Sequence, residues 1–371
     1  MNAASPHVER EASGEFIVDS VGELTPAWFT ATLQTCELIT ADAIVDAADS
    51  EVIGTGQLGH VVRTKLTYDG DSAGPGSLVV KLPSEDPGSR QMGAAMGVYE
   101  AEVRFYQEIA PLIRAGVPQM YSAAVEPSSG RFTLLLNDLG SDAAPGDMLA
   151  GSTPEQAALA IGELVPLQAP VWSKPDLLRR SWLDMARTEM LFAAVGQCLE
   201  PFRARFAHRI EREHMALVEK LAPKAAGVPR TLWKPPFVVA HGDYRLDNMM
   251  FATTPEALPI VVLDWQGARL GPPLLDAAIF LSGCLGPDER REHERTLLGD
   301  YHSALTAAGV HDFSLEDCWQ SYRVSSLYPF LLTVAVSVTI AETERGDMMW
   351  ARLITGAADL INQTGAAKLV D

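Results

Sequence analysis

The chain has 371 residues, of which 47% are hydrophobic and 21% are charged, so it can bury a sizeable core in one large domain or two lobes. Its formal net charge is −19, a field that repels nucleic-acid backbones and anionic membrane surfaces. The four cysteines show no metal-ligand spacing, and the polar first sixteen residues lack the apolar run of a secretion signal. The most apolar stretch, at 331–341, is too short to span a bilayer and predicts a core helix. We therefore expect a cytoplasmic protein that binds neither nucleic acid nor membranes.

Two segments between residues 50 and 82 alternate as strands do, and a turn-rich stretch joins them. The first segment contains Gly54, Gly56 and Gly59 in a G-x-G-x-x-G pattern. A dinucleotide-binding fold places a helix directly after such glycines, whereas HVVRTKLTY here is typical of a strand. Strand–loop–strand is the arrangement in which a glycine-rich hairpin covers nucleotide phosphates. The alternative is an ordinary hairpin turn that needs glycine.

Lys81 ends the apolar run LVVK, from which a lysine either reaches a phosphate or extends into solvent. The segment at 98–113 then has helical spacing, and Glu102 falls on its apolar face. An unpaired carboxylate on such a face is costly, so we expect Lys81 to be its partner. The alternative is a tilted helix that holds Glu102 at its solvent edge.

The segment RFTLLLNDLG, at 131–140, predicts a further strand that stops at a glycine. From about residue 150 the pattern is mostly helical, apart from short apolar runs at 237–265. We therefore predict an α+β protein with a small antiparallel-sheet lobe and a larger, mainly helical lobe. The expected division assigns 1–137 to the first lobe and 138–371 to the second.

The stretch HGDYRLDNMMF, at 241–251, places five polar or charged side chains directly after the apolar run FVVA. Asp243 and Asn248 are spaced D-x-x-x-x-N. In phosphoryl transfer a carboxylate accepts the proton of the attacking hydroxyl while an amide oxygen five residues later binds a metal. A short hairpin then ends at Asp264, which we expect beside Asn248 as a second oxygen ligand for Mg²⁺. An ordinary surface turn explains one polar loop, but not two acidic strand ends joined by a hairpin.

Two further charged residues have alternative roles. Arg245 either neutralises charge on a transferred phosphoryl group or pairs locally with Asp247. Asp276, before the apolar helical run AAIF, either braces the loop that contains Asp243 by hydrogen bonding or caps a helix.

HGDYRLDN, followed by VVLDWQGARLGPPLLDAAIFL, resembles the aminoglycoside phosphotransferase and choline kinase group, which has a protein-kinase-like fold. The ecdysteroid-kinase-like subgroup is the most similar, because it has comparable glycine-loop, E-x-x-F-Y and D-[FW]-Q elements. The resemblance covers about residues 50–285. It implies a catalytic base, two metal ligands and a phosphate-positioning pair, which are respectively Asp243, Asn248 with Asp264, and Lys81 with Glu102.

The same resemblance implies that backbone groups near Asn137 to Leu139 hold adenine.

Two positions depart from the family's pattern. Gln168 stands where relatives often have histidine, and Gln266 stands where protein kinases have the glycine of the Asp-Phe-Gly motif. Neither position supplies a metal ligand, so the departures bear on the substrate rather than on activity.

The function that follows from this resemblance is an ATP- and Mg²⁺-dependent small-molecule kinase that phosphorylates a hydroxyl group of a small alcohol, as a monomer or homodimer. The alternative is a nucleotide-binding pseudokinase that acts as a scaffold, although such proteins usually lack one of the charged positions present here. An oxidoreductase built on the glycine pattern is disfavoured by the strand that follows it.

The sequence leaves two kinds of alcohol as candidates for the phosphoryl acceptor. The acidic net charge is compatible with a cationic aminoglycoside. The segment at 181–195 contains Trp182, Met185, Met190 and Phe192, which either line a pocket for a steroid-like alcohol or pack in the core.

Overall fold

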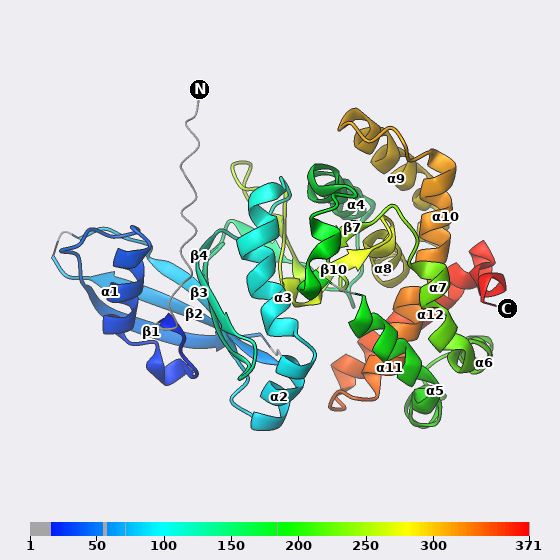
Figure 1. The fold of residues 1–371 in the computed structure, drawn as a ribbon, viewed down its shortest axis with the longest axis horizontal. Helices are drawn as coiled ribbons and strands as arrows, with labels where there is room; N and C mark the ends of the chain where they lie inside the picture. Colours follow the sequence, from blue (N-terminus) through cyan, green and yellow to red (C-terminus); the bar gives the residue numbers. More distant parts are fainter. Residues whose placement is uncertain (1–15, 55–57, 71, 184, 371) are drawn as a thin grey trace. The chain divides into compact units, whose positions relative to one another are not determined.

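The computed structural model describes residues 16–54, 58–70, 72–183 and 185–370 (Figure 1). The chain separates into two compact units. The amino-terminal unit comprises Met1–Gln107 and Pro118–Gly140, and the carboxy-terminal unit comprises Glu108–Val117 and Ser141–Asp371. One unit is built on an antiparallel sheet and the other is mainly helical, which confirms the α+β prediction.

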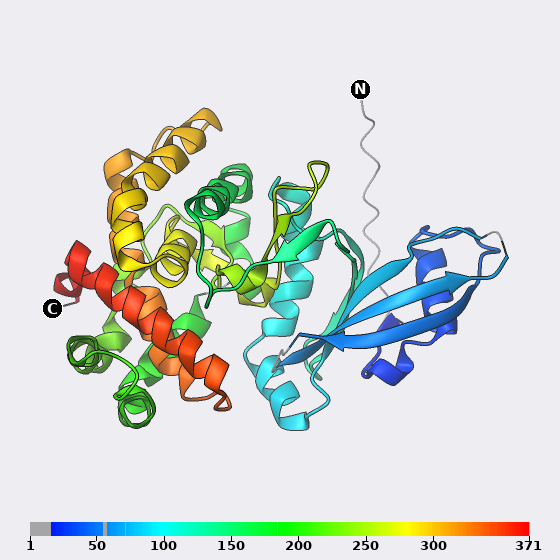
Figure 2. The same ribbon diagram turned by 180° about the vertical axis from the view of Figure 1, so that it is seen from behind.

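The amino-terminal unit contains a five-stranded antiparallel sheet in the order β1-β2-β3-β5-β4 (Figure 2). Its strands are β1 (Val45–Ile53), β2 (Gly59–Tyr68), β3 (Ser77–Pro83), β4 (Met120–Glu126) and β5 (Arg131–Asn137). β1 and β2 pair directly, so the glycine pattern lies in a hairpin between two strands, as predicted. A dinucleotide-binding turn, in which a helix follows the glycines, is thereby excluded.

The first α-helix of this unit begins where the sequence supplies a cap. α1 (Pro26–Thr35) starts with proline after Thr25, whose Oγ1 accepts the N–H of Trp28 at 3.2 Å. Phe29 of α1 is fully buried with Val62 and Val80 of the sheet. The other helices of this unit are α2 (Pro87–Ala95) and α3 (Val98–Arg104), with a 3-10 turn at η2 (Val21–Glu23). The π-helix η3 (Phe105–Ile109) spans the boundary of the two units, and the 3-10 turn η4 (Ala110–Leu112) belongs to the carboxy-terminal unit.

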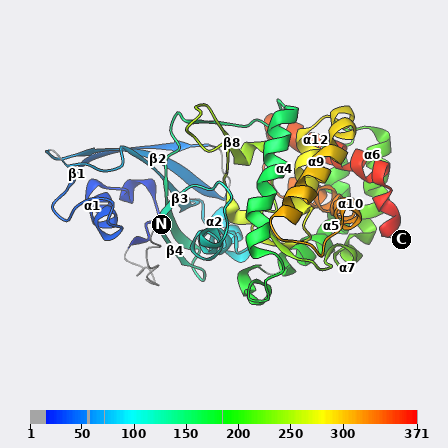
Figure 3. The same ribbon diagram turned by 90° about the horizontal axis from the view of Figure 1, so that it is seen from above.

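Helices form most of the carboxy-terminal unit, and two small sheets lie among them. α4 and α9 pack along one another (Figure 3). The helices are α4 (Pro154–Gln168), α5 (Ala186–Phe206), α6 (Arg212–Leu221), α7 (Pro229–Leu232), α8 (Leu275–Cys284), α9 (Pro287–Ala307), α10 (Leu315–Ser325), α11 (Leu327–Ser337) and α12 (Glu344–Thr364). The strands are β6 (Ala143–Pro145), β7 (Val238–Ala240), β8 (Met249–Ala252), β9 (Ile260–Val262) and β10 (Arg269–Gly271). Short 3-10 turns are η5 (Ala169–Val171), η6 (Leu177–Arg179), η7 (Ser181–Leu183), η8 (Ala222–Gly227), η9 (Leu246–Asn248), η10 (Trp265–Gly267) and η11 (Ala366–Leu369).

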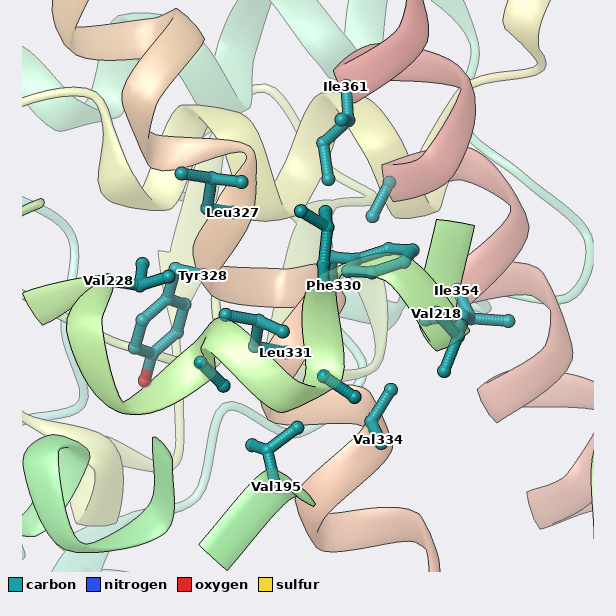
Figure 4. Packing of buried hydrophobic residues seen from close by; sticks show 14 of the residues in the cluster. Val195, Val218, Val228, Leu327, Tyr328, Phe330, Leu331, Val334, Ile354 and Ile361 are labelled. Atoms are coloured by element: carbon teal, nitrogen blue, oxygen red, sulfur yellow. The ribbon is translucent and has the colours of Figure 1, made fainter. Parts of the chain in front are cut away.

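α11 packs against α5 and α12, and its side chains belong to the buried cluster shown in Figure 4. Its Phe330, Leu331 and Val334 are fully buried, together with Val195 and Ile354 of the neighbouring helices. Complete burial of each such side chain stabilises the fold by about 1.5–3 kcal/mol. The apolar stretch that begins at residue 331 is therefore part of a core helix, as predicted.

Among the described residues, no helix combines the length and apolarity that crossing a bilayer requires.

Candidate active site

The loop His241–Asn248, here called the HGD loop, leaves β7 and leads into β8. Its second residue, Gly242, has φ +81°, a conformation that favours glycine. A Cβ at this position would lie 2.7 Å from the carbonyl oxygen of Gly267 and 2.8 Å from Nε of Arg269. The close approach of these backbones therefore requires glycine, and it brings the HGD loop against the segment that follows β9.

Asp243 and Asn248 contact one another at the two ends of the loop's turn. Nδ2 of Asn248 donates hydrogen bonds to the carbonyl oxygen of Asp243 at 2.8 Å and to its Oδ2 at 3.0 Å. Asn248 is buried, whereas the Asp243 side chain is 39% exposed. Because the amide nitrogen of Asn248 is directed at Asp243, its oxygen is the atom suited to bind a metal.

β8 and β9 return the chain to the HGD loop. Met249 pairs with Val262, and the N–H of Leu263 donates to the carbonyl oxygen of Asn248 at 2.8 Å. Asp264 thus follows a residue that is hydrogen-bonded to Asn248, as the hairpin prediction required. Asp264 has φ +63° and ψ +61°, a left-handed conformation that costs about 1–3 kcal/mol in a residue other than glycine.

His241 connects the HGD loop to the end of β9. Its Nδ1 accepts the N–H of Asp243 at 3.2 Å, and its Nε2 lies 2.7 Å from the carbonyl oxygen of Leu263. Nδ1 is therefore the acceptor, and Nε2 is the donor to the carbonyl oxygen of Leu263. The ring also packs against fully buried Trp265, with centroids 4.7 Å apart.

Asp276 braces the HGD loop by hydrogen bonds to its backbone. Its carboxylate accepts the N–H of His241 at 2.8 Å and the N–H of Gly242 at 2.9 Å. Burial raises the pKa of Asp276, while His241, these two N–H groups and Arg269 act in the opposite direction. The bracing role is therefore confirmed, and the alternative of a helix cap is wrong, because α8 has no side-chain cap.

Arg245 forms ion pairs with two carboxylates of the loop. Its Nε lies 2.9 Å and 3.0 Å from the two carboxylate oxygens of Asp243, and Nη1 lies 3.1 Å from Oδ2 of Asp247. Nη1 also donates to Sδ of Met349 at 2.9 Å. Burial by itself would lower the pKa of Arg245, but the charges of Asp243 and Asp247 raise it above its usual value. The local pair with Asp247 is thus present, together with a second pair to Asp243.

In the amino-terminal unit, Lys81 of β3 pairs with Glu102 of α3, with Nζ 2.6 Å from Oε1. The side chains are only 14% and 3% exposed. The pairing predicted from the apolar face of the helix is therefore confirmed, and the solvent-edge alternative is wrong. Gly54 has φ +79° after β1 and Gly59 begins β2, whereas Gly56 lies outside the described residues.

The expected adenine-binding segment begins at the end of β5. Asn137 exchanges hydrogen bonds with Gln119: its N–H donates to the carbonyl oxygen at 2.9 Å, and its Oδ1 accepts the N–H at 2.7 Å. Leu139 is half-buried. Between them, Asp138 accepts from Arg63 at 2.9 Å and from Ser77 at 2.7 Å. The sequence interpretation missed these contacts because the three residues come from separate strands and the loop after β5.

The two glutamines that depart from the family's pattern lie in different surroundings. Gln168 is fully buried, donates to the carbonyl oxygen of Pro273 at 2.9 Å and accepts the hydroxyl of Tyr301 at 2.5 Å. It therefore joins α4 to the segment before α8. Gln266 donates from Nε2 to Oδ2 of Asp264 at 3.1 Å.

The apolar side chains at 181–195 do not share one environment. Phe192 belongs to the buried core, as the packing alternative predicted, but Met190 is 58% exposed. Nε1 of Trp182 donates to Oε2 of Glu108 at 3.1 Å. Helical spacing alone therefore did not separate core residues from surface residues in this segment.

Arg269 is a functional candidate that the sequence interpretation missed. Its guanidinium donates to the carbonyl oxygen of Gly267 and to Oγ1 of Thr188, both at 2.8 Å, and lies 5.6 Å from the ring centre of Tyr328. This buried residue connects α5, α11 and the segment after Asp264. No local pattern marks it, because two of its partners, Thr188 and Tyr328, come from distant parts of the chain.

Comparison with known proteins supports the resemblance seen in the motifs. Residues 178–310 match the model of the Ecdysteroid kinase-like family. A comparison with curated protein sequences finds no match. Each structural likeness described next has an identity well below 25%, so it bears on the fold alone.

Three solved kinase structures have similar folds. One is the GDP complex of wild-type aminoglycoside 2'-phosphotransferase-IIIa, with 14% identity, 91% of this chain and 99% of that chain covered, and a TM-score of 0.52. Another is choline kinase from Cryptosporidium parvum Iowa II, with 11% identity, coverage of 86% and 91%, and a TM-score of 0.52. The third is a Plasmodium vivax ethanolamine kinase, with 12% identity, coverage of 91% and 87%, and a TM-score of 0.50. The kinase-like fold expected from the motifs is therefore confirmed.

Proposed function

We propose that this chain is an ATP- and Mg²⁺-dependent small-molecule kinase that transfers the γ-phosphoryl group to a hydroxyl group of a small alcohol. The observation that carries the proposal is the arrangement around the HGD loop. Asp243 contacts Asn248, and Asn248 is hydrogen-bonded to the residue before Asp264. Two carboxylates and an amide oxygen on adjoining strand ends suit phosphoryl transfer to an alcohol.

In this proposal Asp243 orients the acceptor hydroxyl and accepts its proton as the oxygen–phosphorus bond forms and ADP leaves. Asn248 and Asp276 support this role indirectly. The Nδ2 group of Asn248 holds the Asp243 carboxylate, and the two hydrogen bonds accepted by Asp276 hold the backbone just before it. Arg245, at 2.9 Å from Asp243, brings a permanent positive charge to the site where charge develops on the transferred group.

The proposed metal ligands are the side-chain oxygen of Asn248 and the carboxylate of Asp264. Both are hard oxygen donors, which Mg²⁺ prefers, and the direction of the Asn248 amide nitrogen leaves its oxygen for this purpose. When bound, Mg²⁺ neutralises part of the negative charge on the nucleotide phosphates.

The nucleotide contacts that we propose lie in the amino-terminal unit. Lys81, oriented by Glu102, would hold the α- and β-phosphates, and the hairpin with Gly54, Gly56 and Gly59 would cover them. Backbone groups of Asn137 and Leu139 would hold the adenine. The similar fold of an aminoglycoside phosphotransferase in complex with GDP supports a nucleotide ligand, so ATP and GTP belong in the same assay.

The test compares wild type with Asp243→Ala. Turnover should fall by roughly 10²–10⁴-fold, the range for a lost general base, while ATP affinity changes little. ATP consumption over a panel of aminoglycosides, amino alcohols and steroid-like alcohols, with and without Mg²⁺, would identify the acceptor class. A metabolite extract incubated with ATP and enzyme, then searched by mass for the gain of one phosphoryl group, extends the panel. Equal turnover of variant and wild type would remove Asp243 from the mechanism.

The second candidate is a nucleotide-binding pseudokinase that acts as a scaffold. It predicts that ATP raises the thermal stability of the wild type but is not consumed with any acceptor. The presence of the lysine, base, asparagine and metal aspartate positions favours the active kinase.

We also propose that the protein acts in the cytoplasm as a monomer or homodimer, without nucleic-acid or membrane partners.

A further inference from the structure

The first turn of α12 is tied to the HGD loop by one exposed arginine. Nη2 of Arg345 lies 2.9 Å from Oδ1 of Asp147 and 3.3 Å from Oδ1 of Asp247. Asp147 belongs to the segment between β6 and α4, and Asp247 is the residue before Asn248. One guanidinium therefore joins three segments that are distant in the sequence.

These contacts continue inward as a chain of alternating charges. Asp247 uses Oδ1 toward Arg345 and Oδ2 toward Arg245, and Arg245 in turn contacts both carboxylate oxygens of Asp243. Arg245 is thus shared between two carboxylates. Arg345 places a second positive charge beside Asp247. This charge weakens the electrostatic attraction between Asp247 and Arg245. Removing that charge favours a shift of Arg245 toward Asp247 and makes the loop more negative.

Arg345 is presented from a turn that is itself firmly anchored. Asp347, two residues later, is buried and pairs with Arg205 of α5 at 2.6 Å. Arg205 also donates to the carbonyl oxygen of Ile340 at 3.0 Å. Met349, one turn beyond Arg345, accepts from Arg245. The backbone that carries Arg345 is therefore held by other residues, whereas its own side chain is 62% exposed and contributes little to the core.

Arg345 and Asp147, the ion pair farthest along this chain of contacts from Asp243, are both charged at neutral pH. The hydrogen bond from Arg345 lowers the pKa of Asp147, and Asp147 raises the pKa of Arg345. Because the side chains of Arg345 and Asp147 are 62% and 47% exposed, dissolved salt screens their attraction, unlike that of the buried Arg205–Asp347 pair.

We propose that Arg345 is a positioning residue that holds the HGD loop through Asp247, and that it makes turnover dependent on ionic strength. This inference rests on the proposed phosphotransferase function. Arg345 contacts neither Asp243 nor Asn248 in the described contacts, so its effect passes through Asp247 and Arg245.

The experiment uses Arg345→Gln, which keeps a polar side chain without the charge, and Arg345→Lys, which keeps the charge. The control is Arg291→Gln, because Arg291 is an exposed arginine in an ordinary i,i+3 pair with Asp288 on α9. Turnover and KM for ATP are measured from about 0.01 M to about 1 M salt, over which the Debye length falls from about 30 Å to about 3 Å.

We expect Arg345→Gln to lower turnover at low salt by about three- to tenfold, the range that two exposed ion pairs can supply, with KM for ATP nearly unchanged. Arg345→Lys should recover part of the loss, and Arg291→Gln should match wild type. At high salt, wild type and Arg345→Gln should converge. Equal turnover at low salt, or the same ratio at every salt concentration, would overturn the inference.

Hydrogen exchange separates this inference from the proposed function. The peptide spanning residues 241–252 should exchange faster in Arg345→Gln than in wild type, whether or not the enzyme turns over. A wild type that consumes no ATP contradicts the proposed function, and the exchange result then decides the role of Arg345. Unchanged exchange in that peptide overturns the positioning role in either case.

Discussion

Lys81 and Glu102 form a buried ion pair at 2.6 Å, although 21 positions separate them in the chain. β3 contributes the lysine and α3 contributes the carboxylate. Leaving either charge without its partner would be costly in free energy, because both side chains are largely removed from water. The pair therefore fixes the position of α3 relative to the sheet within the amino-terminal unit.

Lys81→Met should destabilise the protein by about 3–5 kcal/mol, since it removes the cation that a buried carboxylate faces. Urea unfolding, followed by far-ultraviolet circular dichroism, measures this loss. The double variant Lys81→Met with Glu102→Leu should recover most of it, because both charges then leave the core together. Losses that simply add in the double variant would contradict the pairing.

Asp276→Asn should lower both stability and turnover. The amide keeps one acceptor oxygen but directs its NH₂ group at one of the two backbone N–H donors of His241 and Gly242, and an unsatisfied buried donor costs about 1–3 kcal/mol. Thermal unfolding and turnover of the same preparation test this. The control is Asp288→Asn on α9, a 97% exposed aspartate that should behave as wild type. An Asp276 variant with full stability would show that the brace is dispensable.

Two glycines inside helices should respond to alanine in opposite directions. At Gly356 of α12, a Cβ would lie 1.7 Å from the carbonyl oxygen of Ser282 in α8, so Gly356→Ala forces these helices apart at a cost of about 1–3 kcal/mol or more. At Gly162 of α4 the added Cβ meets open space, so Gly162→Ala should stabilise by about 0.5–1 kcal/mol. Denaturant midpoints of the two variants measure both effects, and a shift of the same sign in both would refute this packing argument.

The two buried cysteines should resist alkylation up to high pH. Burial raises the pKa of Cys284 and of Cys318 to about 12. The thiolate is the reactive form, and it appears only as pH approaches the pKa, so at pH 8 about 10⁻⁴ of each thiol is ionised. Mass spectrometry after iodoacetamide treatment should find Cys36 and Cys198 labelled first, because these two residues are only partly buried. Urea should remove the difference, and early native labelling of Cys284 would argue against its burial.

Local sequence was sufficient for several features of the site because each depends on neighbours in the chain. The glycine pattern lies between two paired strands, and the apolar face of α3 predicted a cation beside Glu102. The short hairpin of β8 and β9 predicted that Asp264 lies beside Asn248, and the residue before Asp264 is hydrogen-bonded to Asn248. Strand alternation, helical periodicity and turn length all act over a few residues.

Long-range packing decided the features that the sequence interpretation missed. Arg269 contacts Thr188 of α5 and Tyr328 of α11, and Arg345 of α12 contacts Asp147 and Asp247. Charged residues usually face water, so nothing in the local pattern distinguishes these arginines. The sequence by itself determined which side chains stand at the strand ends. Only the tertiary structure decided which distant charges hold them, because ion pairs form between whichever carboxylates and cations the folded backbone brings within contact.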